Sequence, residues 1–106
     1  MSTGRSNTTF EVVADPARRR ILDLLIDGPL AVGELVAGTG LSQPNTSRHL
    51  RVLRDAGLVK SRPDAQRRIY ELRPEGLLEL ERWLAQYRSL WRDSLDALER
   101  HLDRKE

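Results

Sequence analysis

Cysteine is absent from this 106-residue sequence, which excludes disulfides, thiol redox sensing and zinc fingers. Only two histidines, His49 and His101, remain as soft metal ligands, and neither has the partners of a metal site close in the sequence. No segment approaches the ~18 consecutive apolar residues of a membrane span, and the first ten residues lack the apolar core of a signal peptide. We therefore expect a cytoplasmic protein with no cofactor, no metal and no membrane partner.

Enzyme motifs are also missing from the sequence. No nucleophile with a nearby base, no glycine-rich phosphate loop and no metal set can be assembled from its residues. We therefore do not expect an enzyme.

Charge is abundant but unevenly distributed. Charged residues make up 32% of the chain, although the formal net charge is only +2. Residues 42–73 contain eight basic and three acidic side chains, a net charge of +5, so the remainder is net −3. Because local charge sets the affinity for polyanions, this middle segment indicates a nucleic-acid-binding face. A merely solvated charged surface would have the same composition.

Helix start and stop signals divide the first half of the chain. Thr8 and Glu11 form a capping-box pattern ahead of a short first helix, and Asp15-Pro16 begins a second helix that ends at Gly28-Pro29. Residues 32–37 and 42–56 then form two helical segments around a glycine-containing turn, the pattern of a helix-turn-helix.

The second half changes periodicity after Gly57. Residues 58–62 and 68–72 are strand-like and flank a polar loop at 63–67, which predicts a two-stranded hairpin. From Pro74 onward, leucines and aromatics recur at three-four spacing for nearly thirty residues, which predicts a long helix. We expect one mainly α (α+β) domain over residues 1–106: a winged helix-turn-helix core at 10–75 and a C-terminal helix at 75–104.

The helix at 42–56 carries the candidate site. At 100° per residue, Thr46, Leu50 and Leu53 fall within about 60° of one another and face the core. Glutamine pairs with adenine and arginine with guanine in the major groove, so the opposite arc and the N-terminal end suit base reading. His49 lies on the flank, where contact with DNA and a structural role fit equally well. The candidate DNA-binding residues of this helix are Gln43, Pro44, Asn45, Ser47, Arg48, His49 and Arg51.

Two further arginine groups differ in their expected roles. The hairpin tip is expected to bring Arg62, Gln66, Arg67 and Arg68 together as a wing that reaches flanking phosphates or the minor groove. A solvated loop is the alternative. Residues 18–20 are consecutive arginines that diverge around a helix, for which we favour solvation or intramolecular pairing.

The last helix is too long and apolar for a ~70-residue core to cover. Self-association through Tyr87, Trp91 and the neighbouring leucines is the economical explanation, because aromatic anchors are typical of buried interfaces. Folding back onto its own domain is the alternative.

Several segments together resemble the ArsR-type bacterial repressors: residues 14–22 (ADPARRRIL), 28–35 (GPLAVGEL), 41–53 (LSQPNTSRHLRVL), 56–59 (AGLV) and 68–72 (RIYEL). The tail, with Trp83-Leu84 and Tyr87 to Trp91, is similar to a subgroup without metal-sensing cysteine and histidine sites. The metal-induced derepression of the metal-sensing members is therefore not expected for this sequence. Ala31 stands where a capping Ser or Thr is common, and Thr46 replaces a usual valine.

The resemblance implies a homodimer formed by the first and last helices, with operator release as the switch. It also implies base reading by Gln43, Pro44, Ser47 and Arg48, with phosphate contact by Arg51. The dimer-interface candidates are Phe10, Val13, Leu84, Tyr87, Trp91, Leu95 and Leu98.

These observations favour a sequence-specific regulator, with repression implied by the resemblance alone, that binds a pseudo-palindromic operator in double-stranded DNA as a homodimer. The alternative is a winged-helix protein-protein interaction module without specific DNA binding. The operator, the regulated genes and any inducer are left open by the sequence.

Overall fold

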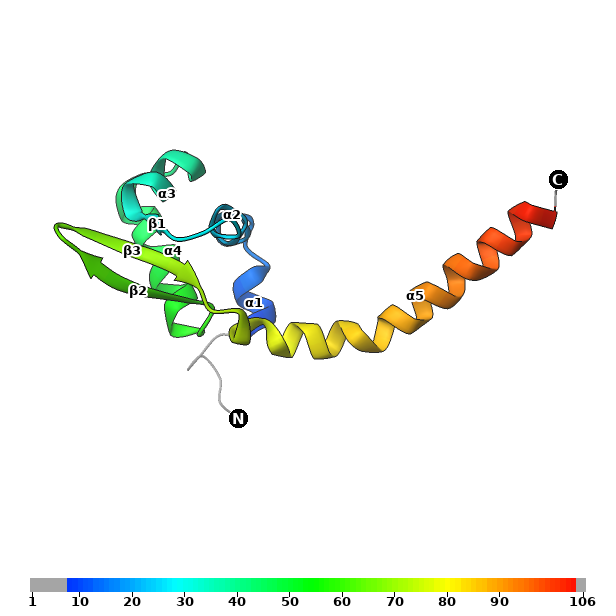
Figure 1. The fold of residues 1–106 in the computed structure, drawn as a ribbon. Coiled ribbons are helices and arrows are strands. Elements are labelled where there is room, and N and C mark those ends of the chain that lie inside the picture. Colours follow the sequence, from blue (N-terminus) through cyan, green and yellow to red (C-terminus); the bar gives the residue numbers. More distant parts are fainter. Residues whose placement is uncertain (1–7, 105–106) are drawn as a thin grey trace.

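The computed structural model describes residues 8–104, and it consists of a winged domain from which one long helix projects (Figure 1). Residues 1–7, where the sequence predicted no signal peptide, and residues 105–106 lie outside the described part. The elements in chain order are α1 (Thr9–Val13), α2 (Pro16–Leu25), β1 (Leu30–Ala31), α3 (Val32–Thr39), α4 (Gln43–Asp55), β2 (Val59–Asp64), β3 (Arg67–Leu72), the 3-10 turn η1 (Pro74–Leu77) and α5 (Leu78–Arg104).

The helix starts that the sequence predicted are confirmed by side-chain caps. Glu11 N–H donates to Thr8 Oγ1 at 3.1 Å while Thr8 N–H donates to Glu11 Oε1 at 2.9 Å, which completes the capping box of α1. Asp15 caps α2 by accepting from Ala17 N–H at 2.8 Å. Ser42 caps α4 in the same way. Each cap satisfies backbone donors that have no partner inside the helix.

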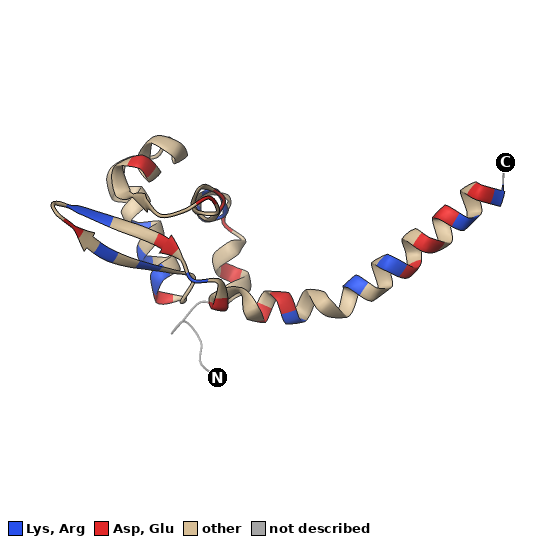
Figure 2. Ribbon diagram, viewed as in Figure 1, with Lys and Arg blue, Asp and Glu red and all other residues tan. Residues whose placement is uncertain are grey.

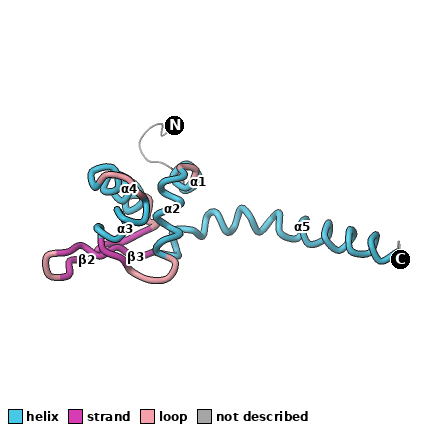
Figure 3. Tube along the Cα trace, turned by 90° about the horizontal axis from the view of Figure 1, so that it is seen from above, coloured by secondary structure: helices cyan, strands magenta, loops and turns pink. Residues whose placement is uncertain are grey.

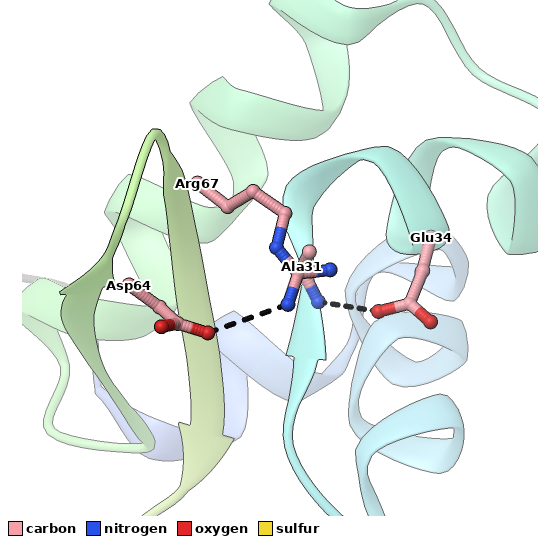
Figure 4. A network of polar contacts seen from close by, with 4 residues as sticks. All are labelled: Ala31, Glu34, Asp64 and Arg67. Carbon is pink, nitrogen blue, oxygen red and sulfur yellow. Dashed lines mark hydrogen bonds and ion pairs between the residues drawn. The ribbon is translucent and has the colours of Figure 1, made fainter.

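The start of α3 lacks such a side-chain cap because Ala31 has no acceptor on its side chain. Glu34 provides half of a capping box instead, since its Oε1 accepts from Ala31 N–H at 2.8 Å (Figure 4). Glu34 therefore partly replaces the capping Ser or Thr that is common at the position of Ala31.

The predicted two-stranded wing is confirmed as the hairpin of β2 and β3, and a third strand that the sequence did not predict, β1, completes an antiparallel sheet in the order β1-β3-β2. Strand β1 pairs Leu30 with Tyr70 and Ala31 with Ile69. A two-residue strand has no alternating pattern to read in a sequence. It forms because β3 offers a free edge beside the start of α3.

The hairpin loop is also shorter than predicted. Strands β2 and β3 continue to Asp64 and Arg67, which pair across a two-residue turn at Ala65 and Gln66. Pro63 lies inside β2, which is possible because β2 is an edge strand and a missing N–H there can face solvent. Pro63 and the polar residues beside it are typical of loops, so the sequence did not predict that β2 continues to Asp64.

Helices α2, α3 and α4 bury one apolar cluster against the base of the hairpin. Ile21, Leu35, Leu50 and Leu53 have 0% exposure, as the helical periodicities predicted for Ile21, Leu35 and α4. Thr46 is also fully buried, and its hydroxyl lies 3.3 Å from the hydroxyl of Thr39. The buried hydroxyl that Thr46 brings in place of the usual valine is therefore partnered and leaves no unsatisfied polar group.

Helix α5 leaves the winged domain after η1 and extends away from it in two views at right angles (Figures 1 and 3). All residues from 81 to 104 are exposed. The alternative prediction, in which this helix folds back along its own domain, is therefore wrong. No helix in the described range is long and apolar enough to cross a membrane.

Candidate nucleic-acid interface

Helix α4 carries the side chains that the sequence predicted to bind DNA. Its buried residues are Thr46, Leu50 and Leu53, and its N-terminal and outward positions are open to solvent. Gln43, Pro44, Asn45, Arg48 and Arg51 are exposed, while Ser47 is half-buried. Gly40, with φ of 75°, closes α3 in the left-handed region and so allows the sharp turn into α4. The helix-turn-helix is thereby confirmed.

Arginines of α4 differ in their local partners. Arg48 donates a hydrogen bond to the side-chain oxygen of Asn45, one turn earlier, which orients its guanidinium along the outer face of the helix. Arg54 lies 3.9 Å from Asp55. Arg48 and Arg51 form no salt bridge with any carboxylate of residues 8–104. Their charge is available to an outside anion.

The wing brings three of its four predicted residues, Gln66, Arg67 and Arg68, to one hollow, and Arg62 is not among the residues that line it. Because side chains alternate along a strand, the pairing of Arg62 with Ile69 and of Asp64 with Arg67 places Arg62 and Arg67 on one face and Arg68 on the other. Arg62 forms a salt bridge with Glu71 at 3.5 Å, and Arg67 forms one with Asp64 at 3.3 Å (Figure 4). Arg68 donates to the hydroxyl of Ser61 at 3.1 Å.

A hollow of about 620 Å³ lies between the N-terminal ends of α3 and α4 and the wing. Gln43 and Ser47 line it from α4, and Gln66, Arg67 and Arg68 line it from the wing. The two groups of predicted DNA-binding residues therefore meet at one surface. Figure 2 shows Lys and Arg on the hairpin and on α4 of the winged domain.

Sequence analysis missed the residues that line this hollow from the start of α3 and from β3, among them Glu34 and Tyr70. Glu34 was readable only as a helix-start residue, and Tyr70 only as a strand residue. Their position depends on how β3 packs beside α3, which no local pattern encodes.

The three consecutive arginines form intramolecular contacts, as the sequence analysis favoured. Arg19 donates to the carbonyl oxygens of Val13 at 3.0 Å and of Ala14 at 3.2 Å. Arg20 Nε donates to the carbonyl oxygen of Gly38 at 3.3 Å.

Arg18 Nε donates to Val12 O at 2.8 Å, and its Nη1 lies 3.4 Å from Nδ1 of His49. The half-buried His49 thus has a partner inside the domain.

Asp15 lies in this same region, at the start of α2. Burial, the largest single effect, would raise the pKa of Asp15, but it is outweighed by the lowering effects together, chiefly hydrogen bonds from the backbone N–H groups of Arg18 and Ala17. The positive charge of Arg18 adds to the shift, so the pKa lies below its ordinary value of 3.8. The carboxylate is therefore ionised while it caps the helix.

Helix α5 begins against α1 through aromatic contacts. The rings of Phe10 and Trp83 pack edge to face with centroids 5.5 Å apart, and Trp83 packs similarly on Tyr87 at 5.1 Å. Farther along, Trp91 is 54% exposed and Leu95 is 65% exposed. Val13, also predicted for the interface, packs partly against the domain's own core. A long apolar stripe on α5 therefore has no cover within residues 8–104.

Comparison with known proteins identifies this architecture. The family described as bacterial regulatory protein, arsR family, matches residues 15–61. The chain is 48% identical over 81 residues to the HTH-type transcriptional regulator Rv2034 of Mycobacterium tuberculosis, covering 76% of each protein. This chain belongs to the ArsR family. It is also 31% identical over 81 residues to the transcriptional repressor SdpR of Bacillus subtilis, covering 76% of this chain and 90% of that one.

Among solved structures, the homodimeric winged helix-turn-helix DNA-binding domain Mb0332 of Mycobacterium bovis has a TM-score of 0.61 and 30% identity. The match covers 74% of this chain and 75% of that domain. The predicted family and winged helix-turn-helix fold are thus confirmed. As an ArsR-family member the chain is a transcriptional regulator and not an enzyme, which favours DNA binding over the interaction-module alternative. Residues 8–104 contain no cluster of three His, Cys, Asp or Glu side chains that could hold a metal ion.

Proposed function

We propose that this ArsR-family protein represses transcription by binding a pseudo-palindromic DNA operator as a homodimer in the bacterial cytoplasm. The observation that supports this most directly is the shared surface of α4 and the wing. Gln43 and Ser47 from the start of α4 line the same hollow as Arg67 and Arg68 from the wing. A duplex that receives α4 in its major groove would pass its backbone along this hollow.

The side chains divide between base reading and phosphate binding. Gln43 and Arg48 are exposed at the N-terminal half of α4 and carry the donor patterns that match adenine and guanine edges. Asn45 supports Arg48 through their hydrogen bond. Arg51 and Arg68 have no carboxylate partner within residues 8–104, so phosphate binding costs them no salt bridge.

Two wing arginines must exchange partners to bind DNA. Arg62 and Arg67 form exposed salt bridges with Glu71 and Asp64. Such pairs contribute only about 0–1 kcal/mol each, so a phosphate can replace the carboxylate at small cost. Gln66 lies in the turn at the tip of the wing and Arg67 directly follows it, so these two side chains lie at the end of the hairpin.

Dimerisation completes the operator-binding unit. The exposed stripe of Leu84, Trp91, Leu95 and Leu98 needs an apolar partner, and the Mb0332 domain, which is similar in fold, is homodimeric. Two copies joined along α5, with α1 beside its first turns, would present two recognition helices to one side of a duplex. Half-sites about 34 Å apart are then expected.

Selection of genomic DNA fragments with purified protein at two salt concentrations tests this function. We expect enrichment of one inverted-repeat sequence, and binding that weakens steeply as salt increases. Footprinting of the enriched fragment should show two protected segments one helical turn apart. Equal binding to every duplex and to heparin at low salt would contradict the proposal.

A further inference from the structure

Arg18 connects three helices through contacts that the interface above does not use. It lies on α2, and its Nε donates to Val12 O in α1 at 2.8 Å. Its Nη1 lies 3.4 Å from Nδ1 of His49 on α4. Both Arg18 and His49 are half-buried. The guanidinium therefore bridges α1 and the recognition helix.

We propose that Arg18 and His49 are positioning residues for operator recognition, which fix the orientation of α4 relative to α1 instead of contacting DNA. This inference rests on the proposed function. His49 directly follows Arg48 and lies one turn after Asn45. Holding the His49 ring at one side of α4 fixes the rotation of the helix about its axis, and hence the direction of Arg48.

The other end of the bridge leads to the dimer helix. Helix α1 has five residues, too few to be stable alone, so its position depends on outside contacts. Arg18 holds its Val12 carbonyl, while Phe10 packs on Trp83 at the start of α5. A displacement of α5 against α1 thus reaches α4 through one side chain. This gives the dimer interface a physical route to the DNA-reading helix.

Arg19 provides a matched control for this role. It is also an arginine of α2 that donates to carbonyl oxygens at the end of α1, those of Val13 and of Ala14 directly after the helix. Its hydrogen bonds within residues 8–104 include none to α4. Removing Arg19 therefore removes a similar tie to α1 without loosening the recognition helix.

The test measures dissociation constants of the full-length protein for its selected operator and for a random duplex, over a series of salt concentrations. We expect Arg18→Ala and His49→Leu each to weaken operator binding about tenfold, because each removes a hydrogen bond that involves a charged group. Random-duplex binding and the salt slope should stay as in the wild type, and Arg19→Ala should retain operator affinity. His49→Gln, whose amide oxygen can accept from Arg18, should recover most of the affinity.

The double variant separates a shared contact from independent effects. If Arg18 and His49 act through each other, Arg18→Ala combined with His49→Leu should be no weaker than either single variant. Additive losses, or a salt slope reduced by about one, would overturn the inference, since the latter marks a direct phosphate contact. Thermal melting confirms that each variant is folded, and His49→Leu tests the contact without altering the tie to α1.

Failure of the inference differs from failure of the proposed function. A wild-type protein that prefers no duplex overturns both. A wild-type protein with a clear operator that Arg18→Ala and His49→Leu bind equally well overturns only the positioning role.

Discussion

Gly76 packs directly on the carbonyl group of Gly57: a Cβ placed on Gly76 would lie 2.1 Å from that oxygen. Gly57 follows α4 with φ of 81°, and Gly76 lies in η1 at the base of α5. The two turns therefore touch backbone to backbone, with Arg73 N–H also donating to Leu58 O at 2.8 Å. This contact fixes where α5 leaves the domain.

Gly76→Ala should destabilise the protein, since the added methyl group meets backbone that cannot move aside as a flexible side chain could. Overpacking of this kind costs about 1–3 kcal/mol. Urea unfolding measures the change. Gly33→Ala is the control, because Gly33 lies in α3 with no heavy atom within 4 Å of its added Cβ. A neutral or slightly stabilising effect is expected there, and equal loss in both variants would contradict the packing argument.

Arg48→Ala and Arg67→Ala should affect DNA binding differently. Arg48 on α4 is expected to read a base, so its loss should cost about 1–3 kcal/mol on the operator and relax specificity at one position. Arg67 on the wing is expected to bind phosphate, so its loss should weaken all duplexes similarly and reduce the salt slope by about one. Fluorescence anisotropy with operator and random DNA measures both. If the two variants had identical effects on every DNA sequence, Arg48 would not be a base-reading residue.

Trp91→Glu should dissociate the dimer because it places a charge in the apolar stripe of α5, where Trp91 is 54% exposed in the isolated chain. Sedimentation velocity should show monomers, and operator affinity should fall because one half-site alone binds weakly. Ser89→Glu is the matched control, since Ser89 is exposed and projects from the opposite side of α5. Dimers in both variants would refute this interface.

Acid should weaken the contribution of Asp15 to stability. Its pKa is held below the ordinary 3.8, so the folded state favours the carboxylate. The resulting stability is fully present above about pH 4, and it is lost as the pH falls through the lowered pKa. Asp15→Asn keeps a cap without the charge. The difference in unfolding free energy between wild type and Asp15→Asn should therefore shrink in urea titrations from pH 5 to pH 3.

Ala65→Gly should stabilise the wing slightly. Ala65 adopts φ of 58° at the first central position of the hairpin turn, where glycine is preferred. Relief of about 1–2 kcal/mol of left-handed strain exceeds the ~0.4–1 kcal/mol that glycine costs through the unfolded chain. Thermal melting should show a small increase. Ala65→Val, which is branched at Cβ, should lower the melting temperature instead.

Local signals predicted most of the helical framework. Thr8, Asp15 and Ser42 were readable as caps because their hydrogen bonds reach only two or three residues along the chain. The buried side of α4 was predictable because Thr46, Leu50 and Leu53 recur with the period of an α-helix. The predicted outward residues of α4 were likewise found exposed, apart from half-buried Ser47 and His49.

Features that depend on distant segments escaped the sequence analysis. Strand β1 exists only because β3 lies beside it, and the 31-residue separation of Arg18 from His49 hides their contact. The faces of the wing arginines were not predictable for a related reason. Cross-strand register, with Asp64 opposite Arg67, decided which arginines share a face, and register is a property of two strands together.

Pro63 has a consequence for how the protein behaves at high concentration. It interrupts the row of amide donors on β2, the outer strand of the sheet, and the charged Lys60 and Arg62 flank the same edge. An added strand from another molecule would find a missing hydrogen bond and repulsive neighbours. The wing can thus extend far from the core without acting as a template for aggregation.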